Sequence, residues 1–468
     1  MTAFDSAIHL TYLAAATCFV LGLHLMNSPA SARRGNTLSA VGMGVAVAAT
    51  VAVVIRSGTV SATGWIVVGT GIAVGTAFGW ISARRVAMTA MPQLVSLFNA
   101  VGGGAAAVIA LHDFVRLAGG DIPPRISVPV VLDVMIGAVT FTGSLIASGK
   151  LQGIVASRPL VFPGVRTLNA LLVLIMVAGG GFVVSGHSSV AVLMAVLVAA
   201  SAFGVTMVLP IGGADMPVVI SLLNAFTGTA VAMAGFVIDN RVLIISGALV
   251  GASGTILTKL MADAMNRSIG NIIIGGFGTG DSTGIAVATG VVLREVHADD
   301  AALQLAYASR VIIVPGYGLA AAQAQHEVRE LADLLETRGV GVSYAIHPVA
   351  GRMPGHMNVL LAEANVPYSL LKDMEEVNPD FSRADVALVI GANDVINPAA
   401  RRSGNPVSGM PILDVDRARS VIVIKRSMGQ GYAGIDNELY ADPKTGMYFA
   451  DAKKGLAELA VAVKALVG

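Results

Sequence analysis

The pattern in this sequence most typical of ligand chemistry is a glycine-rich turn at position 316. The apolar run 310–315 is predicted to be a short buried strand, and it leads directly into Gly316, Gly318 and Ala321, then a helix to about Arg338. A Gly-x-Gly-x-x-Ala turn of this kind aims a helix N-terminus at the pyrophosphate of a dinucleotide. Because the turn stands between a strand and a helix, it predicts a nucleotide-binding site.

Basic residues indicate which dinucleotide this would be. An NAD site usually has an acidic residue near the end of the second strand. Here that strand ends at His347 and Arg352 follows, while Lys425, Arg426 and Ser427 come directly after a later strand. Positive charge beside a hydroxyl suits a 2′-phosphate. These residues favour NADP(H), and the alternative for the Lys-Arg pair is a solvated strand end.

Two apolar segments repeat one another. Residues 91–107, MPQLVSLFNAVGGGAAA, align without gaps on residues 216–232, MPVVISLLNAFTGTAVA. Each copy holds a Ser and an Asn three residues apart, which places both polar groups on one face of a helix. The pairs are Ser96 with Asn99 and Ser221 with Asn224.

These polar pairs allow two interpretations. The structural one is hydrogen bonding between helices, because polar groups in lipid find partners. The functional one is a water path, because strongly polar groups inside a membrane span usually line a wet route. The matched positions of Asn99 and Asn224, with Asp215 just before the second copy, favour the water path.

Other polar residues in the apolar stretches give weaker signals. Asp133 lies inside one apolar run and Asp113 near the end of another. Either could belong to a proton relay, and a salt bridge or a snorkelling contact explains them equally well. Four histidines fall near the ends of predicted spans, where an interfacial imidazole is the ordinary interpretation and a relay the alternative. They are His9, His24, His112 and His187.

Composition shows where these residues must lie. The 468 residues are 55% hydrophobic and only 13% charged, so most of the chain must sit in lipid. Residues 1–267 carry 13 basic and 7 acidic residues, and residues 268–468 carry 17 and 22. This predicts a transmembrane domain over 1–267 and a soluble domain over 268–468. The single cysteine, Cys18, excludes a disulfide framework and a cysteine metal cluster, and no metal site is predicted.

The apolar runs are long enough for about nine transmembrane helices, since a span needs roughly 20 residues. With the N-terminus outside, nine basic residues fall in inside loops and four in outside loops, which satisfies the positive-inside rule. The soluble domain is then cytoplasmic. The spans are predicted near 5–27, 35–55, 63–82, 91–115, 127–149, 166–185, 188–209, 216–237 and 241–262.

The charge-rich C-terminal part alternates between predicted strands and helices. After the strand at 310–315, further strands are predicted near 340–346, at 386–390 and at 420–424, with helices near 357–365 and from about Ala450. This alternation is typical of a parallel sheet with helices on its faces. The predicted fold is a polytopic α-helical membrane bundle followed by a Rossmann-like α/β domain.

The chain resembles the β subunit of the bacterial proton-translocating NAD(P) transhydrogenase. The resemblance covers essentially the whole length and rests on several long motifs. They are 91–104, Gly212–Pro217, Ala264–Ser268, Pro315–Ala320, His347–His356, Gly391–Asp394, Lys425–Ser427 and Gly431–Gly434.

The resemblance implies an N-terminal membrane domain and a C-terminal domain that binds NADP(H) in an orientation reversed relative to the usual Rossmann arrangement. It also implies roles for four groups of residues. Nucleotide contacts are implied for Gly316, Tyr317, Gly318, Leu319, Ala320, Val349, Ala350, Gly351, Arg352, Met353 and Pro354; the nicotinamide end for Gly391, Ala392, Asn393 and Asp394; the 2′-phosphate for Lys425, Arg426 and Ser427; and a lid for Gly431, Tyr432 and Ala433.

One position departs from the family pattern, since some members have a protonatable His where this chain has Asn99. An amide cannot carry a proton at neutral pH, so a relay here must use water held by Asn99 and Asn224, or a group from another subunit. Asp394, a carboxylate in the predicted nucleotide pocket, is the candidate link between protonation and nucleotide affinity. Its alternative is a hydrogen bond to ribose or amide.

The predicted function is hydride transfer from NADH to NADP⁺ coupled to inward proton movement across the bacterial inner membrane. The chain has no second dinucleotide pattern, so the NAD(H) site must lie on a partner, an alpha subunit that also carries membrane helices. A dimer of the alpha-beta assembly is expected in the lipid, without nucleic acid. The alternative is an ion channel or secondary transporter with a cytoplasmic nucleotide-sensing domain.

Overall fold

The computed structural model describes residues 3–87, 90–118, 120, 122–156, 160, 162–212, 216–264, 269–270, 293–351, 355–403, 405, 407–429, 431 and 433–466. Internal contacts divide the chain into two compact units. Unit 1 comprises Met1–Ile211 and Val219–Thr258, and unit 2 comprises Gly212–Val218 and Lys259–Gly468. The boundary predicted between residues 267 and 268 lies outside the described residues and stays a prediction.

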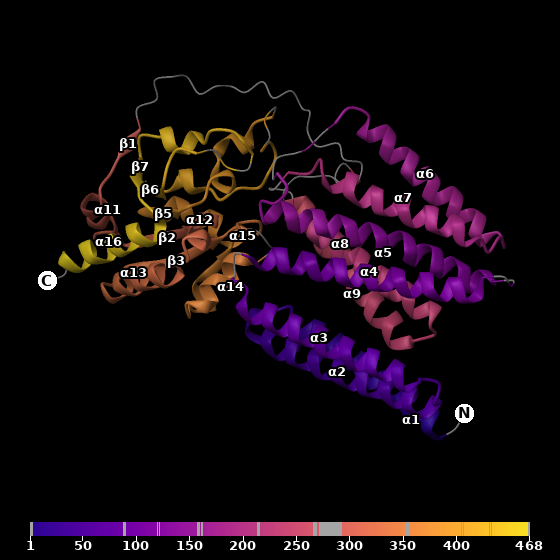
Figure 1. Cartoon of the computed structure of the whole chain (residues 1–468). Helices are drawn as coiled ribbons and strands as arrows, with labels where there is room; N and C mark the ends of the chain where they lie inside the picture. The colour runs from indigo at the N-terminus through magenta and orange to yellow at the C-terminus, as the bar shows by residue number, and fades with distance from the viewer. Residues whose placement is uncertain are drawn as a thin grey trace. The chain divides into compact units, whose positions relative to one another are not determined.

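The described N-terminal part holds nine helices long and apolar enough to cross a membrane, and each matches a predicted span (Figure 1). Their exposed surfaces are rich in Leu, Ile, Val and Phe, as lipid-facing surfaces must be. The helices are α1 (Ala3–Leu25), α2 (Pro29–Ser57), α3 (Ala62–Arg85), α4 (Met91–Leu117), α5 (Pro124–Leu151), α6 (Val165–Val184), α7 (Val190–Val208), α8 (Met216–Val237) and α9 (Arg241–Ala264).

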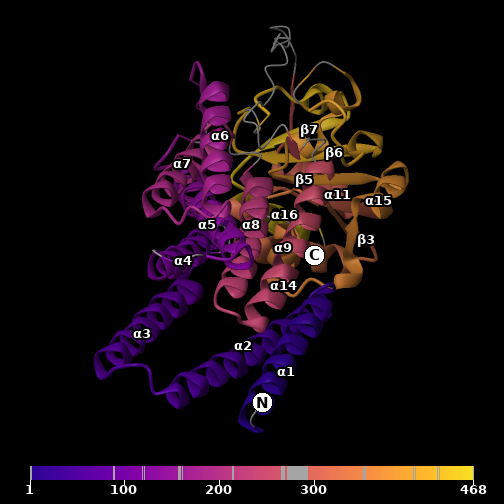
Figure 2. The ribbon, with the colours of Figure 1, turned by 90° about the vertical axis from the view of Figure 1, so that its right-hand side faces the viewer.

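Glycines let several of these helices approach closely. Gly103 of α4 lies against Gly137 of α5, and a Cβ added at Gly103 would come within 3.0 Å of the Gly137 carbonyl oxygen. Gly228 of α8 lies in the same way against Gly247 of α9, where an added Cβ would clash with backbone. Small residues at crossings give helices their packing contacts in lipid, where no hydrophobic drive brings them together. The antiparallel pairs α4–α5 and α6–α7 run side by side in both views (Figures 1 and 2).

The C-terminal part is a seven-stranded parallel sheet in the order β1-β7-β6-β5-β2-β3-β4. The chain passes from β2 outward to β4, returns to β5 and then proceeds to β7, which is the doubly wound Rossmann order with β1 added at one edge. The strands are β1 (Arg294–Glu295), β2 (Arg310–Pro315), β3 (Gly341–Ile346), β4 (Leu371–Asp373), β5 (Val386–Ile390), β6 (Ser420–Lys425) and β7 (Thr445–Phe449).

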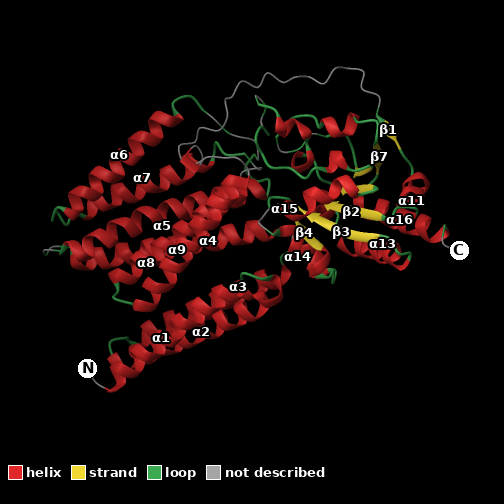
Figure 3. Ribbon diagram, turned by 180° about the vertical axis from the view of Figure 1, so that it is seen from behind, coloured by secondary structure: helices red, strands yellow, loops and turns green. Residues whose placement is uncertain are grey.

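Helices connect these strands (Figure 3). Asp451 caps the last helix, because its side chain accepts a hydrogen bond of 3.1 Å from the Lys453 amide. The α-helices are α11 (Ala298–Ala306), α12 (Tyr317–Ala321), α13 (Gln325–Thr337), α14 (His356–Glu363), α15 (Met374–Val377) and α16 (Ala452–Ala465), and the 3₁₀ turns are η2 (Tyr368–Leu370), η3 (Asn378–Arg383), η4 (Asp394–Ile396), η5 (Pro398–Arg401), η6 (Val415–Arg417) and η7 (Glu438–Ala441).

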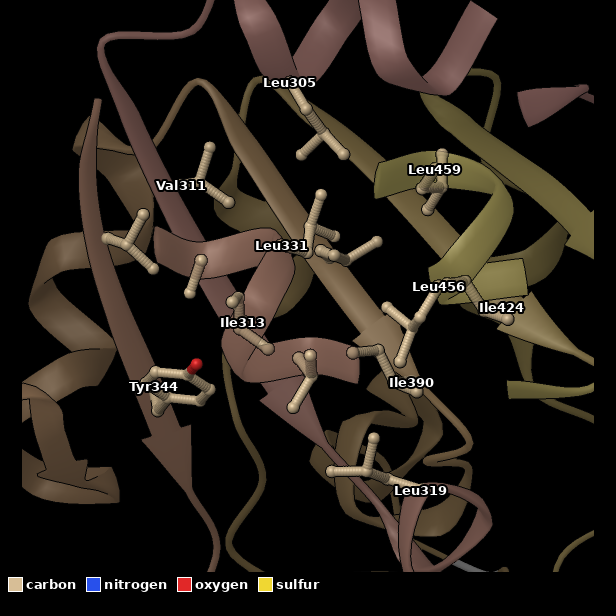
Figure 4. Close-up of a cluster of buried hydrophobic side chains, with 14 of the residues drawn as sticks. Leu305, Val311, Ile313, Leu319, Leu331, Tyr344, Ile390, Ile424, Leu456 and Leu459 are labelled. Atoms are coloured by element: carbon tan, nitrogen blue, oxygen red, sulfur yellow. The ribbon is translucent and has the colours of Figure 1, made fainter. Parts of the chain in front are cut away.

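Both faces of the sheet are buried, which explains the unbroken apolar runs of its strands. Residues at alternate positions, such as Ile313 and Ile390, enter one core with the helix residues Leu331 and Leu456 (Figure 4). Their neighbours along each strand, such as Val314, enter a second core on the opposite face. The fold class predicted from the sequence is therefore confirmed.

Several elements differ from the prediction: the short strands β1 and β4 and the helices α11 and α15 are not predicted, and two further differences have a physical reason. The helix expected to run to about Arg338 is broken at residues 322–324, because Gln323 adopts a positive φ of 51° that no helix can contain. Strand β7 was not predicted. Its sequence, Thr-Gly-Met-Tyr-Phe, has a glycine in its interior, which weakens the strand signal.

Candidate functional site

A cleft of about 440 Å³ opens at the carboxyl ends of the central strands of unit 2. In doubly wound sheets this edge is where ligands bind, at the point where strand order reverses, and here the reversal falls between β2 and β5. The lining residues are Gly316, Tyr317, Gly318, Ala321, Ala322, Val349, Ala350, Gly351, Gly391, Ala392, Asn393, Asp394, Val395, Ile424, Lys425, Arg426, Ser427, Gly429, Gly431, Ala450, Asp451 and Ala452.

The loops after β2 and β5 cross in contact at this cleft. The Gly316 amide donates to Ile390 O and the Gly318 amide to Gly391 O, each at 2.9 Å. Gly391 has a φ of 64°, and a Cβ there would clash with the Cα of Gly318. Only glycine combines this backbone conformation with so close an approach. We name this contact between 316–318 and 391–392 the glycine crossing.

The glycine crossing gives the two glycines of the turn a structural role. Helix α12, which follows the turn, has five residues. The amides of Gly316 and Gly318 donate to the β5 strand and loop. The two glycines therefore join two loops at the switch point, and a role of the turn toward a pyrophosphate stays a prediction.

The loop after β3 is fixed by a buried histidine. His347 is 2% exposed; its Nε2 lies 2.8 Å from Pro411 O, and its Nδ1 accepts a 3.2 Å hydrogen bond from the Val349 amide. This requires the neutral tautomer with a proton on Nε2. Burial lowers the pKa of His347, although the hydrogen bond to Pro411 opposes the shift. A neutral imidazole thus holds Val349, Ala350 and Gly351 at the cleft.

The half-buried carboxylate of Asp394 contacts the predicted lid. The Ala433 amide donates to Asp394 Oδ2 at 3.0 Å, and a Cβ at Gly431 would overlap the carboxylate. The neighbouring Asn393 accepts hydrogen bonds from Asn437 and Tyr440. Asp394, Gly431 and Ala433 therefore form one connected group, and their implied roles stay predictions.

Lys425, the last residue of β6, lines the cleft together with Arg426 and Ser427, which follow it. Lys425 Nζ donates to Gly429 O at 2.6 Å and lies 4.7 Å from the Tyr440 ring centroid. Burial lowers the pKa of Lys425, and the charges of Asp394 and Asp436 act against that shift. The side chains of Arg426 and Ser427 are exposed. This segment places two cations and a hydroxyl beside one another, a donor set that suits a phosphate.

Most of the cofactor-binding residues implied by the resemblance line the cleft, and the exceptions have physical reasons. Leu319 and Ala320 are fully buried, with 0% exposure, behind the turn, and Ala433 reaches the cleft only through Asp394. Some of the implied residues lie outside the described part of the chain. They are Arg352, Met353, Pro354 and Tyr432.

One wall of the cleft was not predicted from the sequence. Ala450 and Asp451 follow β7, Ala452 begins α16, and all three line the cleft with Val395. The signal that could have found them is the helix cap at Asp451, two residues after the aromatic pair Tyr448-Phe449. A strand that leads into a capped helix brings its turn to the same sheet edge as the other loops.

In unit 1 the two copies of the repeat differ. Asn99 is 5% exposed and its Nδ2 donates to Ile220 O of α8 at 3.3 Å, so α4 and α8 are joined. Asn224 is half-buried, and its side chain makes no hydrogen bond with a described residue. Ser96 donates to Ser144 O at 2.8 Å, and Ser221 accepts from Thr258 at 2.9 Å. Asp215 lies outside the described residues.

The other titratable residues predicted in or near the membrane helices differ in how deeply they are buried. The four histidines are exposed or half-buried, and His187 stacks on Phe182 at 4.2 Å. Asp113 is half-buried near the end of α4. Asp133 is fully buried, and neither of its carboxylate oxygens has a hydrogen-bond partner among the described residues.

Fold and cleft together define a multi-pass helical membrane protein with a Rossmann-like domain. A family model described as NAD(P) transhydrogenase beta subunit matches residues 8–462. Two proteins named NAD(P) transhydrogenase subunit beta, both from Rhodospirillum rubrum, are each 48% identical to this chain over 454 residues, 95% of this chain and 96% of theirs. The chain belongs to the NAD(P) transhydrogenase beta subunit family. Membership implies binding of a nicotinamide nucleotide and an alpha subunit as partner.

Proposed function

We propose that this chain binds NADP(H) in the cleft of unit 2, selecting it over NAD(H). The observation that carries the proposal is the meeting of two features in one cleft. The glycine crossing lies at the switch point of the sheet, and Lys425, Arg426 and Ser427 present charge and a hydroxyl to the same space. The residues fit the group: the cations would hold the 2′-phosphate, and Arg352 to Pro354 would complete the loop after β3.

When bound, NADP⁺ would accept a hydride from NADH held by the alpha subunit, since the sequence has a single dinucleotide pattern. This chain's residues supply position rather than a nucleophile. Gly391, Ala392, Asn393 and Asp394 would border the nicotinamide end, and Gly431 to Ala433 would cover it. The support for this arrangement is the contact between Asp394 and the lid.

Coupling to proton movement would work through nucleotide affinity. Protonation in the membrane unit must change the relative affinity for NADP⁺ and NADPH, because coupling is a difference in binding free energy between states. Asp394 is the proposed link, since a carboxylate that contacts the lid can bias whether the lid closes. In the membrane unit, Asn99 and Asn224 would hold water, with Asp215 at the cytoplasmic mouth.

The chain would lie in the inner membrane with a periplasmic N-terminus and a cytoplasmic unit 2, as the excess of basic residues in alternate loops supports. Residues 1–267 would conduct protons and 268–468 would bind NADP(H). The assembly would be a dimer of alpha and beta subunits, and protons would move inward as NADP⁺ is reduced.

Inverted membrane vesicles that hold the complete assembly test this function. NADH and an NADP⁺ analogue added outside should react, because unit 2 would face the outer medium of such vesicles, and an uncoupler should abolish the acceleration that respiration gives. A reaction seen only in right-side-out vesicles would contradict the orientation, and an uncoupler without effect would contradict the coupling.

Calorimetry on the full chain in detergent tests the nucleotide preference. Replacing Lys425 or Arg426 by Gln should remove about 1.5–3 kcal/mol of NADP(H) binding for each charge-assisted bond lost, with little effect on NAD(H). The matched control is Arg383→Gln, an exposed arginine before β5 and thus at the opposite edge of the sheet. Equal affinity of the unmodified chain for both nucleotides would remove the 2′-phosphate argument.

A further inference from the structure

Unit 1 contains a buried carboxyl group to which the proposed function gives no role. Asp133, in the first half of α5, is 0% exposed. Neither carboxylate oxygen has a hydrogen-bond partner among the described residues, and no described cation forms an ion pair with it. Buried polar groups are nearly always paired, and an intramembrane carboxyl without a partner is costly. Among the described residues, neither a salt bridge nor a snorkelling contact accounts for Asp133.

The position of Asp133 on α5 is set by its neighbours. Asp133, Gly137, Thr140 and Ser144 are spaced by four, three and four residues, so they share one helix face. That face meets α4, because Gly137 lies against Gly103 and Ser144 O accepts the hydrogen bond from Ser96. Asp133 therefore lies on the seam between α4 and α5.

The seam carries further polar groups in its other half. Ser144 is 0% exposed, and its hydroxyl has no hydrogen-bond partner among the described residues. Oε1 of the buried Gln93 likewise has no hydrogen-bond partner there. Ser148 donates to Gln93 O at 3.2 Å. Between these groups and Asp133 the seam is closed by the contact of Gly103 with Gly137. It thus has two polar halves separated by a tight glycine contact.

The surroundings of Asp133 are apolar. Val130 and Val134, on either side of it, pack with Ala110 and Phe114 of α4 and with residues of α6 and α7. Helices α7 and α8 contain no charged residue or histidine. The ionisable groups of the other segments lie at helix ends or in loops: Arg125 and Lys150 of α5, His112, Asp113 and Arg116 of α4, Arg166 of α6, and His187 and Asp239 in loops.

None of these groups pairs with Asp133. Lys150 is 17 residues farther along α5, about 25 Å by helix rise, and its Nζ donates to Ile211 O at 2.7 Å. A carboxylate without a cation nearby is stable in such a place only when it carries a proton or reaches water. Asp133 can therefore exchange one proton without breaking any contact of the described structure.

We propose that Asp133 is a proton-binding site of the membrane unit, and that it holds one proton between the outer surface and the polar groups near Asn99. Loading forms an O–H bond between a proton from water and one carboxylate oxygen, and release breaks that bond and restores the carboxylate; no electron moves. The Gly103–Gly137 contact separates the loaded carboxyl from the other half of the seam. The proposal rests on the proposed coupling to protons.

Proton uptake by vesicles holding the complete assembly, followed with a fluorescent pH dye, tests the proposal. Asp133→Asn keeps the side-chain shape and cannot bind a proton, so the rate should fall about 100-fold, the size expected when a proton-transfer group is removed. Asp133→Glu should restore much of it. The matched control is Asp239→Asn, an exposed carboxylate with a φ of 51° that Asn tolerates, and it should pump normally.

Infrared spectroscopy of the unmodified assembly gives a second, activity-independent readout. A carbonyl band of a protonated carboxylic acid should be present, should vanish in Asp133→Asn and should persist in Asp239→Asn. The thermal unfolding midpoint in detergent should be close to that of the unmodified assembly in all variants, which shows that they are folded. Absence of any protonated-carboxylic-acid band from the unmodified assembly would overturn the proposal even if Asp133→Asn failed to assemble, and so would a band that persists unchanged in folded Asp133→Asn.

The failures are distinguishable. If the unmodified assembly moves no protons, the proposed coupling is wrong and the role of Asp133 falls with it. If the unmodified assembly pumps and folded Asp133→Asn pumps at the same rate, only the assignment of Asp133 is wrong. A normal rate in Asp133→Asn with full loss in Asn224→Leu would move the path to α8.

Discussion

Each unit of this protein contains a place where glycines let two segments touch. In unit 2 the loops after β2 and β5 meet at Gly318 and Gly391, and in unit 1 α8 and α9 meet at Gly228 and Gly247. At both places an added Cβ would clash with backbone atoms, not with a movable side chain. The same residue type thus serves close approach in a water-soluble sheet and in a lipid-facing bundle.

The two places differ in which groups satisfy hydrogen bonds. At the glycine crossing of unit 2 the backbone amides pair between the loops, and the side chains of Arg426 and Ser427 stay exposed at the cleft. In unit 1 the helices satisfy their own backbone, and polar side chains bond to carbonyls of neighbouring helices, as Asn99 does to Ile220. A polar residue in the cleft is therefore available to a ligand, whereas one in the bundle is often part of the packing.

The largest expected effect comes from filling the crossing of unit 2. Gly391→Ala places a Cβ at a φ of 64° against the Cα of Gly318. The left-handed conformation costs about 1–2 kcal/mol, and the forced shift of packed loops adds about 1–3 kcal/mol. We expect a large loss of NADP(H) affinity by calorimetry and a lower midpoint for thermal unfolding of unit 2.

Gly434→Ala separates these two costs. Gly434 has a φ of 69° and nothing within 4 Å of an added Cβ, so it should show only the conformational cost. If Gly391→Ala and Gly434→Ala destabilise equally, the contact between the loops is unimportant and the crossing does not shape the cleft.

The next effect concerns the two asparagines of the repeat. Asn224→Leu removes no hydrogen bond to a described residue, whereas Asn99→Leu removes the bond to α8, worth about 0.6–2 kcal/mol in lipid. Both variants should lose proton pumping and still bind NADP(H), but only Asn99→Leu should unfold at a lower temperature. Dye quenching and thermal scans in detergent measure the two properties. Equal thermal stability would show that the α4–α8 bond contributes nothing.

The sequence predicts what is local and periodic. All nine membrane helices follow from long apolar runs, and strands β2, β3, β5 and β6 follow from apolar segments bounded by turns. Lys425, Arg426 and Ser427 could be assigned to the cleft because they stand at the end of a predicted parallel strand. The repeat predicts that Ser96 and Asn99 share one helix face, and both are buried.

Contacts between distant segments could not be predicted. The sequence of the turn at Gly316 is the same whether its amides face a ligand or a neighbouring loop, and the partner loop at Gly391 lies three strands later in the chain. The partner of Asn99 is 121 residues away. Ala450 to Ala452 reach the cleft only because β7 pairs with β6, a pairing that no local pattern encodes. The place of each polar residue along its helix or strand was thus predictable, and the partner with which it forms a hydrogen bond was not.

The smallest expected effect is a dependence of unit 2 on pH. The hydrogen bonds from Asn99 to α8 and from Thr258 to Ser221 in unit 1 come from amide and hydroxyl groups, which do not titrate near neutral pH. Burial lowers the pKa of His347 below the unfolded value of about 6.5. The neutral imidazole of His347 therefore stabilises the fold at pH values above about 6.5. This stabilisation is lost as the pH falls below that value, by at most about 1.4 kcal/mol per pH unit. Protonation of Nδ1 would also break the bond from the Val349 amide.

Below about pH 6.5 we therefore expect weaker protection of the Val349 amide from hydrogen exchange relative to its intrinsic rate, weaker NADP(H) binding and a lower unfolding midpoint for unit 2. His347→Leu should remove the dependence and lower affinity at all pH values, because the loop loses its support. His326→Leu, at an exposed histidine of α13, is the control and should keep the dependence. If His347→Leu retains the full pH slope of the unmodified chain, another group titrates, and the loop after β3 is held by its backbone alone.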